Sequence, residues 1–239
     1  MHIVISDDYQ DSIRQLSCFE KTKNHTVKIY NDTVTGVDAL AERFKDAEAI
    51  VLIRERTVVD KALLDRLPKL KVISQTGKMA SHVDLEACKA KGIVVMDGRG
   101  SGAATAELNM LLILAALRKL VDEVSRLKGG QWQGYVGSQL SGKVLGVYGF
   151  GRIGKQVCEL GKAFGAKPLV WGRDSSLEKA KQAGYDTASS KEEFFRNCDI
   201  VCLQLRLNDQ THGIVKASDL ALMKPTSLLV NASRAELIE

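Results

Sequence analysis

The sequence predicts an α/β protein built from two doubly wound parallel sheets. Short β-branched and other apolar runs alternate with amphipathic segments along the chain, which is the pattern of βαβ units. A glycine-rich stretch interrupts this alternation once, and a second series of apolar runs follows it. With 239 residues, of which 45% are hydrophobic and 26% charged, the chain is long enough for two small domains with real cores.

The elements follow in order along the chain. The first series has apolar runs that predict strands at residues 2–6, 26–30, 49–54, 71–77 and 92–97, with amphipathic helices at 36–44 and 59–67. A long helix is expected from about Ala103 to Leu127, and the glycine-rich stretch 129–134 ends it. The second series predicts strands at residues 143–150, 167–172, 199–205 and 227–233. We therefore expect one domain at residues 1–101 and another at 102–239, with the boundary near 98–102.

Composition and charge exclude several classes of protein. The net charge is +5, but the basic residues are scattered and few aromatic residues lie among them, which argues against nucleic-acid binding. The five cysteines show no CxxC or Cys/His spacing, so we expect reduced thiols in a cytoplasmic protein and no metal site. No signal-peptide pattern is visible at the N-terminus. The uncharged run Leu108–Leu117 is too short to span a bilayer and predicts a helix buried on all sides, within the domain or at a subunit contact.

The most informative motif is the glycine pattern in "VLGVYGFGRIGKQV", residues 144–157. Gly149, Gly151 and Gly154 follow an apolar strand and open a helix. In such a pattern the first glycine makes a tight turn, the second lets the backbone approach a pyrophosphate, and the third lets helix and strand pack closely. The amide groups at the start of the helix, around Arg152 and Ile153, then face the phosphates. The motif predicts dinucleotide binding; the alternative is a tight glycine turn without a ligand.

The tip of the next strand bears on the choice of cofactor. An acidic residue about 20 residues after the motif usually binds the ribose 2′-hydroxyl of NAD. Here Gly172 stands near that position and is followed by Arg173, Asp174 and Ser175. Arginine and hydroxyl groups suit a 2′-phosphate, which favours NADP. The alternative is NAD, with Asp174 reaching the ribose.

Four segments together resemble the D-isomer-specific 2-hydroxyacid dehydrogenases. They are "LPKLKVISQTG", "LGVYGFGRIGKQV", "DIVCLQLRLNDQTHGIV" and "LALMKPTSLLVNASR", and the resemblance runs over essentially the whole chain. It implies a flavodoxin-like substrate-binding (catalytic) domain, a Rossmann NAD(P)-binding domain, and a homodimer built around the latter. It also implies hydride transfer between NAD(P)H and a small 2-keto acid, as in glyoxylate or hydroxypyruvate reductases.

The resemblance assigns site residues. Arg234, in Asn231-Ala232-Ser233-Arg234, matches the family's substrate-orienting arginine, whose forked donors suit the two oxygens of a keto acid. The loop with Gly77 and Lys78 matches the one that holds the substrate carboxylate, and Arg54 matches a position that faces the substrate. Near the cofactor the resemblance places Thr211, Ala232 and Ser233. Two departures are Gln204, where many relatives carry histidine, and Ala235, which replaces the usual glycine.

The resemblance also implies a general acid, a histidine paired with a glutamate, some tens of residues after Arg234. The sequence ends at Glu239, before those positions. Three interpretations follow: a fragment of an active enzyme, which we favour; an inactive truncated or degraded gene product; or a non-catalytic dinucleotide-binding module. In the sequence as given, the resemblance implies that the last strands of the Rossmann sheet are absent, so strand 227–233 would be an exposed apolar sheet edge unless another chain covers it.

Overall fold

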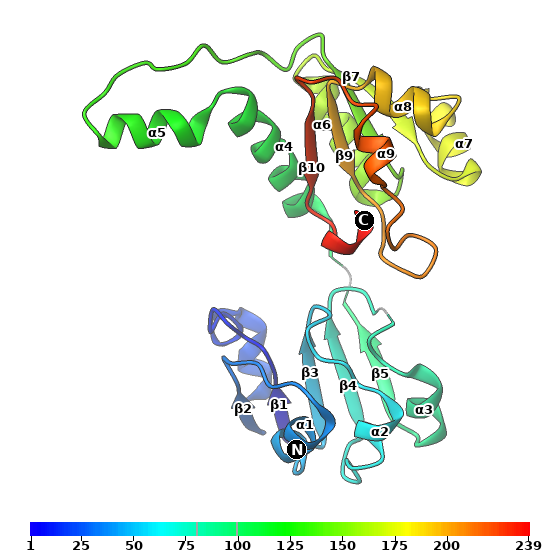
Figure 1. Ribbon diagram of the computed structural model, residues 1–239. Coiled ribbons are helices and arrows are strands. Elements are labelled where there is room, and N and C mark those ends of the chain that lie inside the picture. The colour runs from blue at the N-terminus through cyan, green and yellow to red at the C-terminus, as the bar shows by residue number, and fades with distance from the viewer. Residues whose placement is uncertain (80, 99) are drawn as a thin grey trace. The chain divides into compact units, whose positions relative to one another are not determined.

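Two parallel β-sheets organise the chain, one in each half (Figure 1). The computed structural model describes residues 1–79, 81–98 and 100–239, and these divide into two compact units, Met1–Gly100 and Ser101–Glu239. Arg99, within the expected boundary segment, lies outside the described residues. No helix in the described part of the chain has the length and apolar character needed to cross a membrane.

The sheet of unit 1 has the order β2-β1-β3-β4-β5, with all strands parallel. This is the doubly wound order 2-1-3-4-5 of flavodoxin-like domains, as predicted. Its strands are β1 (His2–Ile5), β2 (Thr26–Ile29), β3 (Ala49–Ile53), β4 (Val72–Thr76) and β5 (Val94–Asp97). Its helices are α1 (Val37–Phe44), α2 (Lys61–Leu64) and α3 (Leu85–Ala90), and two short 3₁₀ segments cover Ile13–Gln15 and Ser17–Thr22.

The core of unit 1 lies between its sheet and its helices. Phe44 on α1 and Ile50 and Leu52 on β3 are completely buried. Aspartates begin two of the helices, because a carboxylate accepts the otherwise unpaired amide hydrogens of a first turn. Asp60 accepts from the amide of Leu63, and Asp84 from that of Ala87, each at 2.9 Å.

The sheet of unit 2 has the order β10-β9-β6-β7-β8, again all parallel. When the five strands are numbered within the unit and the sheet is read from β8 to β10, the order is 3-2-1-4-5, which is that of nucleotide-binding Rossmann domains. The strands are β6 (Val144–Tyr148), β7 (Lys167–Trp171), β8 (Asp186–Thr187), β9 (Ile200–Leu203) and β10 (Leu228–Asn231). The helices that follow the first strand are α6 (Arg152–Ala163), α7 (Asp174–Gln182), α8 (Lys191–Asn197) and α9 (Ala217–Leu220), and a 3₁₀ turn covers Ala235–Leu237.

The expectation of one long helix from Ala103 to Leu127 was wrong. The structure has two helices, α4 (Ala103–Leu117) and α5 (Leu120–Lys128), separated by Lys119 in a left-handed conformation with φ of 53°. Helix α5 projects away from the sheet of unit 2 (Figure 1) and has no buried residue. A left-handed residue cannot continue a right-handed helix, so the backbone turns at Lys119.

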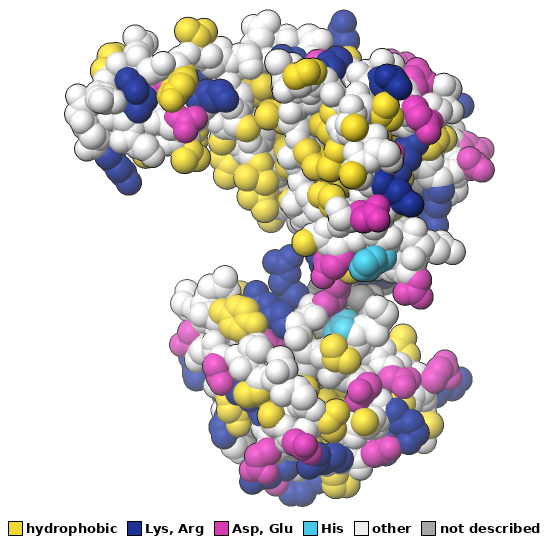
Figure 2. All heavy atoms as spheres, viewed as in Figure 1, with side chains coloured by type: hydrophobic (Ala, Val, Ile, Leu, Met, Phe, Trp, Pro, Cys, Tyr) yellow, Lys and Arg dark blue, Asp and Glu magenta, His cyan; other side chains and the backbone are white. Residues whose placement is uncertain are grey.

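Of the two places expected for the burial of Leu108–Leu117, the interior of the domain is wrong, and a subunit contact stays a prediction. Asn109, Met110, Ile113 and Leu117 are buried, but Leu108, Leu111 and Leu112 are 44%, 58% and 42% exposed. Figure 2 shows hydrophobic side chains gathered over this part of unit 2. Helix α4 is therefore apolar on two faces, of which only one packs within its own unit.

Candidate functional site: the carboxyl edge of the second sheet

The glycine motif forms a tight turn between β6 and α6, as predicted. Gly149 has φ of 102°, a conformation that favours glycine, and its amide donates to the carbonyl of Trp171 at 2.8 Å. A Cβ at Gly149 would lie 2.7 Å from the carbonyl oxygen of Gln204. A Cβ at Gly154 would lie 2.1 Å from the carbonyl oxygen of Gly149. Both positions therefore require glycine for steric reasons.

The backbone at the second glycine of the turn is not covered by other atoms. A Cβ at Gly151 would meet no atom within 4 Å, so the backbone is open to a ligand there. Helix α6 begins at Arg152 and carries no acidic residue in its first turn. The unpaired amide groups of this turn, which include those of Arg152 and Ile153, and the positive end of the helix dipole favour an anion. A nicotinamide dinucleotide bound there would supply the hydride for reduction.

Strand β7 delivers the residues that bear on the choice of cofactor. Arg173 precedes α7, and its carbonyl accepts from the amide of Ser176 at 2.7 Å. Arg173, Asp174 and Ser175 are all exposed at this tip. In the described part of the chain no carboxylate lies within ion-pair distance of Arg173. The guanidinium of Arg173 and the carboxylate of Asp174 are therefore both accessible at the tip of β7. This geometry is compatible with either NADP or NAD as the cofactor.

Arg234 follows β10, the edge strand next to β9. Asn231 fixes the backbone here: its Nδ2 donates to the carbonyl of Arg234 at 2.7 Å, and its Oδ1 accepts from the amide of Ser233 at 3.0 Å. Ser233 Oγ donates to the carbonyl of Leu203 on β9 at 2.9 Å. Arg234 is half-buried, and its Nη1 donates to the carbonyl of Ser233 at 2.9 Å. Ala232 lies half-buried within the same turn.

Backbone hydrogen bonds join the segment after Arg234 to the loop at residues 213–215 of unit 2. Leu237 is completely buried, and its carbonyl accepts from the amide of Val215 at 3.0 Å. The amide of Gly213 donates to the carbonyl of Glu236 at 2.8 Å. Thr211, at the start of this loop, closes a turn by donating from its Oγ1 to the carbonyl of Arg206 at 2.6 Å. Thr211 is thus a loop-closing residue in the structure, and its predicted place near the cofactor stays a prediction.

The predicted substrate residues of unit 1 lie together at the carboxyl ends of β3 and β4. Arg54 is exposed and has φ of 59°, and its amide donates to Thr76 Oγ1 at 3.3 Å. Gly77 and Lys78 follow β4 directly, both exposed, and Gly77 has φ of 93°. Strand ends of this kind are where parallel sheets bind ligands. Neighbouring strands therefore present Arg54 and the Gly77–Lys78 loop at one edge.

A buried pair of side chains supports that edge. Gln75 Nε2 donates to the carbonyl of Arg54 at 2.6 Å, and Gln75 Oε1 lies 3.1 Å from Nε2 of His82. Because Gln75 presents its carbonyl to the ring, His82 Nε2 carries the proton. Burial lowers the pKa of His82, so its imidazole is neutral at physiological pH. His82 is thus a buried structural residue.

The buried cysteines do not supply a nucleophile. Burial raises the pKa values of Cys158, Cys198 and Cys202 to about 12, so these thiols stay protonated at neutral pH. Among the described residues no group of three or more His, Cys, Asp or Glu side chains could hold a metal ion.

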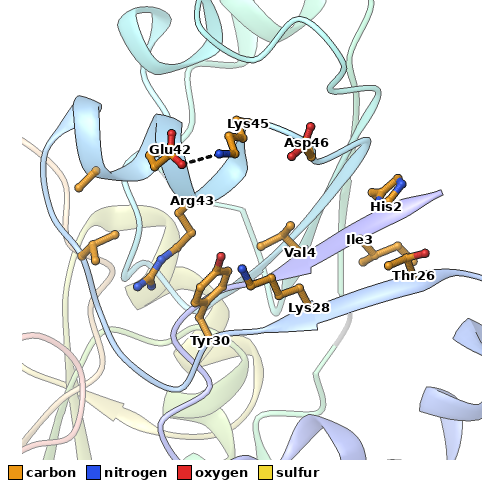
Figure 3. A pocket seen from close by; sticks show the side chains of 12 residues that line it. His2, Ile3, Val4, Thr26, Lys28, Tyr30, Glu42, Arg43, Lys45 and Asp46 are labelled. Atoms are coloured by element: carbon orange, nitrogen blue, oxygen red, sulfur yellow. Dashed lines mark hydrogen bonds and ion pairs between the residues drawn. The ribbon is translucent and has the colours of Figure 1, made fainter.

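A hollow of about 550 Å³ lies elsewhere in unit 1, beside β1, β2 and α1 (Figure 3). Its charged side chains are largely engaged with one another or with a ring. Tyr30 lies between Arg43 and Lys28, whose charged groups are 4.1 and 4.8 Å from the ring centroid, and Lys45 pairs with Glu42 at 2.5 Å. None of the described residues predicted from the sequence as site residues lines this hollow.

The strand order and the glycine turn define unit 2 as a dinucleotide-binding Rossmann domain. Comparison with known proteins agrees: residues 110–239 match the family model described as "D-isomer specific 2-hydroxyacid dehydrogenase, NAD binding domain". The chain therefore belongs to the D-isomer-specific 2-hydroxyacid dehydrogenase family, and the resemblance drawn from the sequence is confirmed. Its cofactor class is accordingly a nicotinamide dinucleotide.

Individual relatives carry more than one name. The chain is 35% identical over 213 residues to a D-3-phosphoglycerate dehydrogenase of Methanocaldococcus jannaschii, covering 87% of this chain and 40% of that protein. It is 34% identical over 213 residues to a glyoxylate reductase of Aeropyrum pernix, covering 84% of this chain and 63% of that protein. A crystal structure named phosphoglycerate oxidoreductase from Vibrio cholerae O395 is 48% identical, with a TM-score of 0.93 over 100% of this chain and 77% of the other. The chain thus spans less than two thirds of the length of these two curated relatives.

Two features of the site were missed by sequence reasoning. One is the Gln75–His82 pair, in which Gln75 also binds the carbonyl of Arg54, and the other is a partly buried contact between Asn109 and Gln204, just after β9. The second had a signal in the sequence, because Asn109 is a single polar residue within an otherwise apolar helical run.

Proposed function

We propose that this chain binds a nicotinamide dinucleotide and a small 2-keto or 2-hydroxy acid for hydride transfer between them, as in glyoxylate or hydroxypyruvate reductases. One observation carries the proposal: a single edge of the unit 2 sheet holds both the glycine turn after β6 and Arg234 after β10. The turn and the first amides of α6 bind the pyrophosphate. Arg234 orients the carboxylate of the acid and polarises its carbonyl, because a guanidinium donates through two parallel N–H groups.

Unit 1 has candidate residues of its own. Arg54, Gly77 and Lys78 are proposed to bind a carboxylate at the carboxyl ends of β3 and β4, where Lys78 adds a positive charge. Ala232, Ser233 and Thr211 lie on the cofactor side. We assign no proton donor among residues 1–239, so binding and turnover require separate tests.

The test of the proposed function measures NADH binding by fluorescence and then NADH oxidation in the presence of glyoxylate. We expect saturable NADH binding that Gly151→Ala weakens. Oxidation that depends on the keto acid supports an enzyme, whereas binding without oxidation favours the alternative of a non-catalytic dinucleotide-binding module. Absence of NADH and NADPH binding by a folded chain contradicts both.

For the cofactor we propose NADP, bound through Arg173 and Ser175 at the tip of β7. Arg173→Ala is expected to weaken NADPH binding about tenfold, because a charge-assisted hydrogen bond to a phosphate is lost, and to leave NADH binding within about twofold. The measurement is a fluorescence titration with each cofactor. Arg196→Ala, an exposed arginine on α8, is the matched control.

The alternative, NAD bound through Asp174, has its own signature. If Asp174→Ala weakens NADH binding while Arg173→Ala changes neither cofactor, the ribose hydroxyls are held by the carboxylate and the NADP proposal is wrong.

We also propose a homodimer formed through α4 and α5. Beyond the exposed leucines of α4, Val121 and Leu127 on α5 are 75% and 57% exposed. Exposed apolar side chains gathered on neighbouring helices mark candidate interaction sites. A second copy of the chain would cover it, as the family resemblance implies.

The double variant Leu111→Glu/Val121→Glu is expected to convert the dimer to a monomer, because the dimer would have to bury two charges on each chain. Light scattering coupled to size-exclusion chromatography measures the mass. Lys128→Glu, at the end of α5, is a control for added negative charge. A monomeric unsubstituted chain at micromolar concentration contradicts the proposal.

A further inference from the structure

A chain of amide groups links helix α4 to the carboxyl end of β9. Asn109 is completely buried, and its Nδ2 donates to the carbonyl of Thr105 at 2.7 Å. Its Oδ1 accepts from Nε2 of Gln204 at 2.8 Å and from Sγ of Cys202 at 3.3 Å. A buried amide destabilises the fold unless its polar atoms are paired, and here both ends of the Asn109 amide have partners.

These contacts fix the direction of every group. A backbone carbonyl only accepts, so Asn109 must turn its NH₂ toward Thr105 and its carbonyl toward Gln204. Gln204 must then donate from its own NH₂, and its Oε1 faces away from Asn109. Oε1 accepts no hydrogen bond from the described residues, and it is not among the buried atoms that lack a partner, so it retains access to solvent. The pair therefore presents a fixed acceptor.

The backbone of Gln204 lies beside the glycine turn. The amide of Gln204 donates to the carbonyl of Tyr148 at 2.8 Å, and the carbonyl oxygen of Gln204 lies 2.7 Å from where a Cβ of Gly149 would be. In the sheet, β9 lies on one side of β6, and β7 lies on the other. A dinucleotide with its pyrophosphate on the turn and its adenosine ribose at the tip of β7 extends its other half over β9 and β10.

We propose that Gln204 Oε1 accepts a hydrogen bond from the nicotinamide riboside half of the bound dinucleotide, and that Asn109 is the positioning residue that turns this acceptor outward. The proposal rests on the dinucleotide site proposed above. Two donors in that half share the required chemistry, the carboxamide N–H and the ribose hydroxyls. Because Asn109 engages its NH₂ group, Gln204 presents only an acceptor to the ligand.

Gln204→Met tests the acceptor, because methionine keeps the length of the side chain and removes both polar atoms. The dissociation constants of NADH, ADP-ribose and ADP are measured by calorimetry, with thermal unfolding as the check on folding. We expect NADH binding to weaken about five- to tenfold, as for the loss of one hydrogen bond, and ADP binding to stay within twofold. A loss shared by ADP-ribose identifies a ribose hydroxyl as the donor; a loss confined to NADH identifies the carboxamide.

Gln210→Met, the same substitution in the exposed loop after β9, is the matched control and is expected to change none of the three. The proposal is overturned if Gln204→Met weakens ADP as much as NADH, which would indicate general distortion, or if it weakens nothing. Failure of the proposed function looks different, because then the unsubstituted chain binds none of the three ligands.

Asn109→Leu tests the positioning role, since leucine is close in volume and lacks the amide. It is expected to weaken NADH binding about threefold and ADP binding not at all. The double variant with Gln204→Met should bind NADH no more weakly than Gln204→Met alone, because Asn109 acts through Gln204. Additive losses, or equal losses for NADH and ADP, would show that Asn109 serves the packing of α4 instead.

Discussion

Gly154→Ala is expected to lower the free energy of unfolding of unit 2 by about 3 kcal/mol and its Tm by about 10 °C. The added methyl group would lie 2.1 Å from the carbonyl oxygen of Gly149, a backbone atom of a turn that is itself packed against Gln204. Neither side can move without opening the contact between helix α6 and strand β6. Thermal unfolding followed by circular dichroism measures the change.

Gly151→Ala is the matched control in the same turn. A methyl group there meets no atom within 4 Å, and the φ of −91° suits alanine, so the Tm should stay within about 2 °C. NADH binding should nevertheless weaken about tenfold, because the methyl group occupies the approach of the pyrophosphate. If the Tm of Gly154→Ala equals that of the unsubstituted chain, the close packing of the turn is not as described.

Arg234→Gln is expected to weaken the binding of oxamate, a 2-keto acid analogue, to the NADH-loaded chain by about a hundredfold. The lost interaction is a desolvated, charge-assisted pair with the carboxylate, which contributes roughly 3 kcal/mol. The oxamate affinity of Arg234→Lys should lie between those of Arg234→Gln and the unsubstituted chain, because lysine keeps the charge but not the paired donors. NADH binding itself should stay within about twofold. Calorimetric titration of oxamate gives the affinities.

Arg206→Gln serves as the control for Arg234→Gln, since Arg206 is an exposed arginine in the loop after β9. Oxamate affinity that is the same in Arg234→Gln as in the unsubstituted chain would remove Arg234 from the substrate site. Equal losses in both variants would point to the overall positive field instead.

The parts of the fold that the sequence predicted have local physical causes. Strands buried on both faces must be apolar runs, as in Ile200–Leu203, and a turn with a positive φ and no room for a Cβ must contain glycine, as at Gly149. Strand β8 was not predicted because it has neither an apolar run nor a glycine turn. It consists of two polar residues, Asp186–Thr187, and is positioned by its pairing with β7. The break between α4 and α5 at Lys119 has no sequence signal either. Lysine rarely adopts a left-handed conformation, and the apolar pattern continues across this position.

The candidate site divides in the same way. The glycine turn was predictable from its motif, and the role of Arg234 stays a motif-based prediction. The Asn109–Gln204 contact joins residues 95 positions apart and depends on how α4 packs on the sheet. Arg173 and Asp174 are adjacent at one strand tip, so their position alone does not distinguish the 2′-phosphate of NADP from the ribose diol of NAD. The exposed leucines of α4 show a further limit: an apolar run predicts burial but does not say by which surface.

The backbone that carries Arg234 is held at both ends, by the pairing of β10 with β9 and by the contacts of Glu236 and Leu237 with the 213–215 loop. Ordering a loose residue takes about 1–2 kcal/mol of conformational entropy, and a ligand that orders its own binding loop loses that much affinity for each residue it fixes. Here the ordering is complete on folding. If Arg234 binds a carboxylate as proposed, the ligand does not have to order the main chain around it, and the affinity is not reduced by that entropic cost.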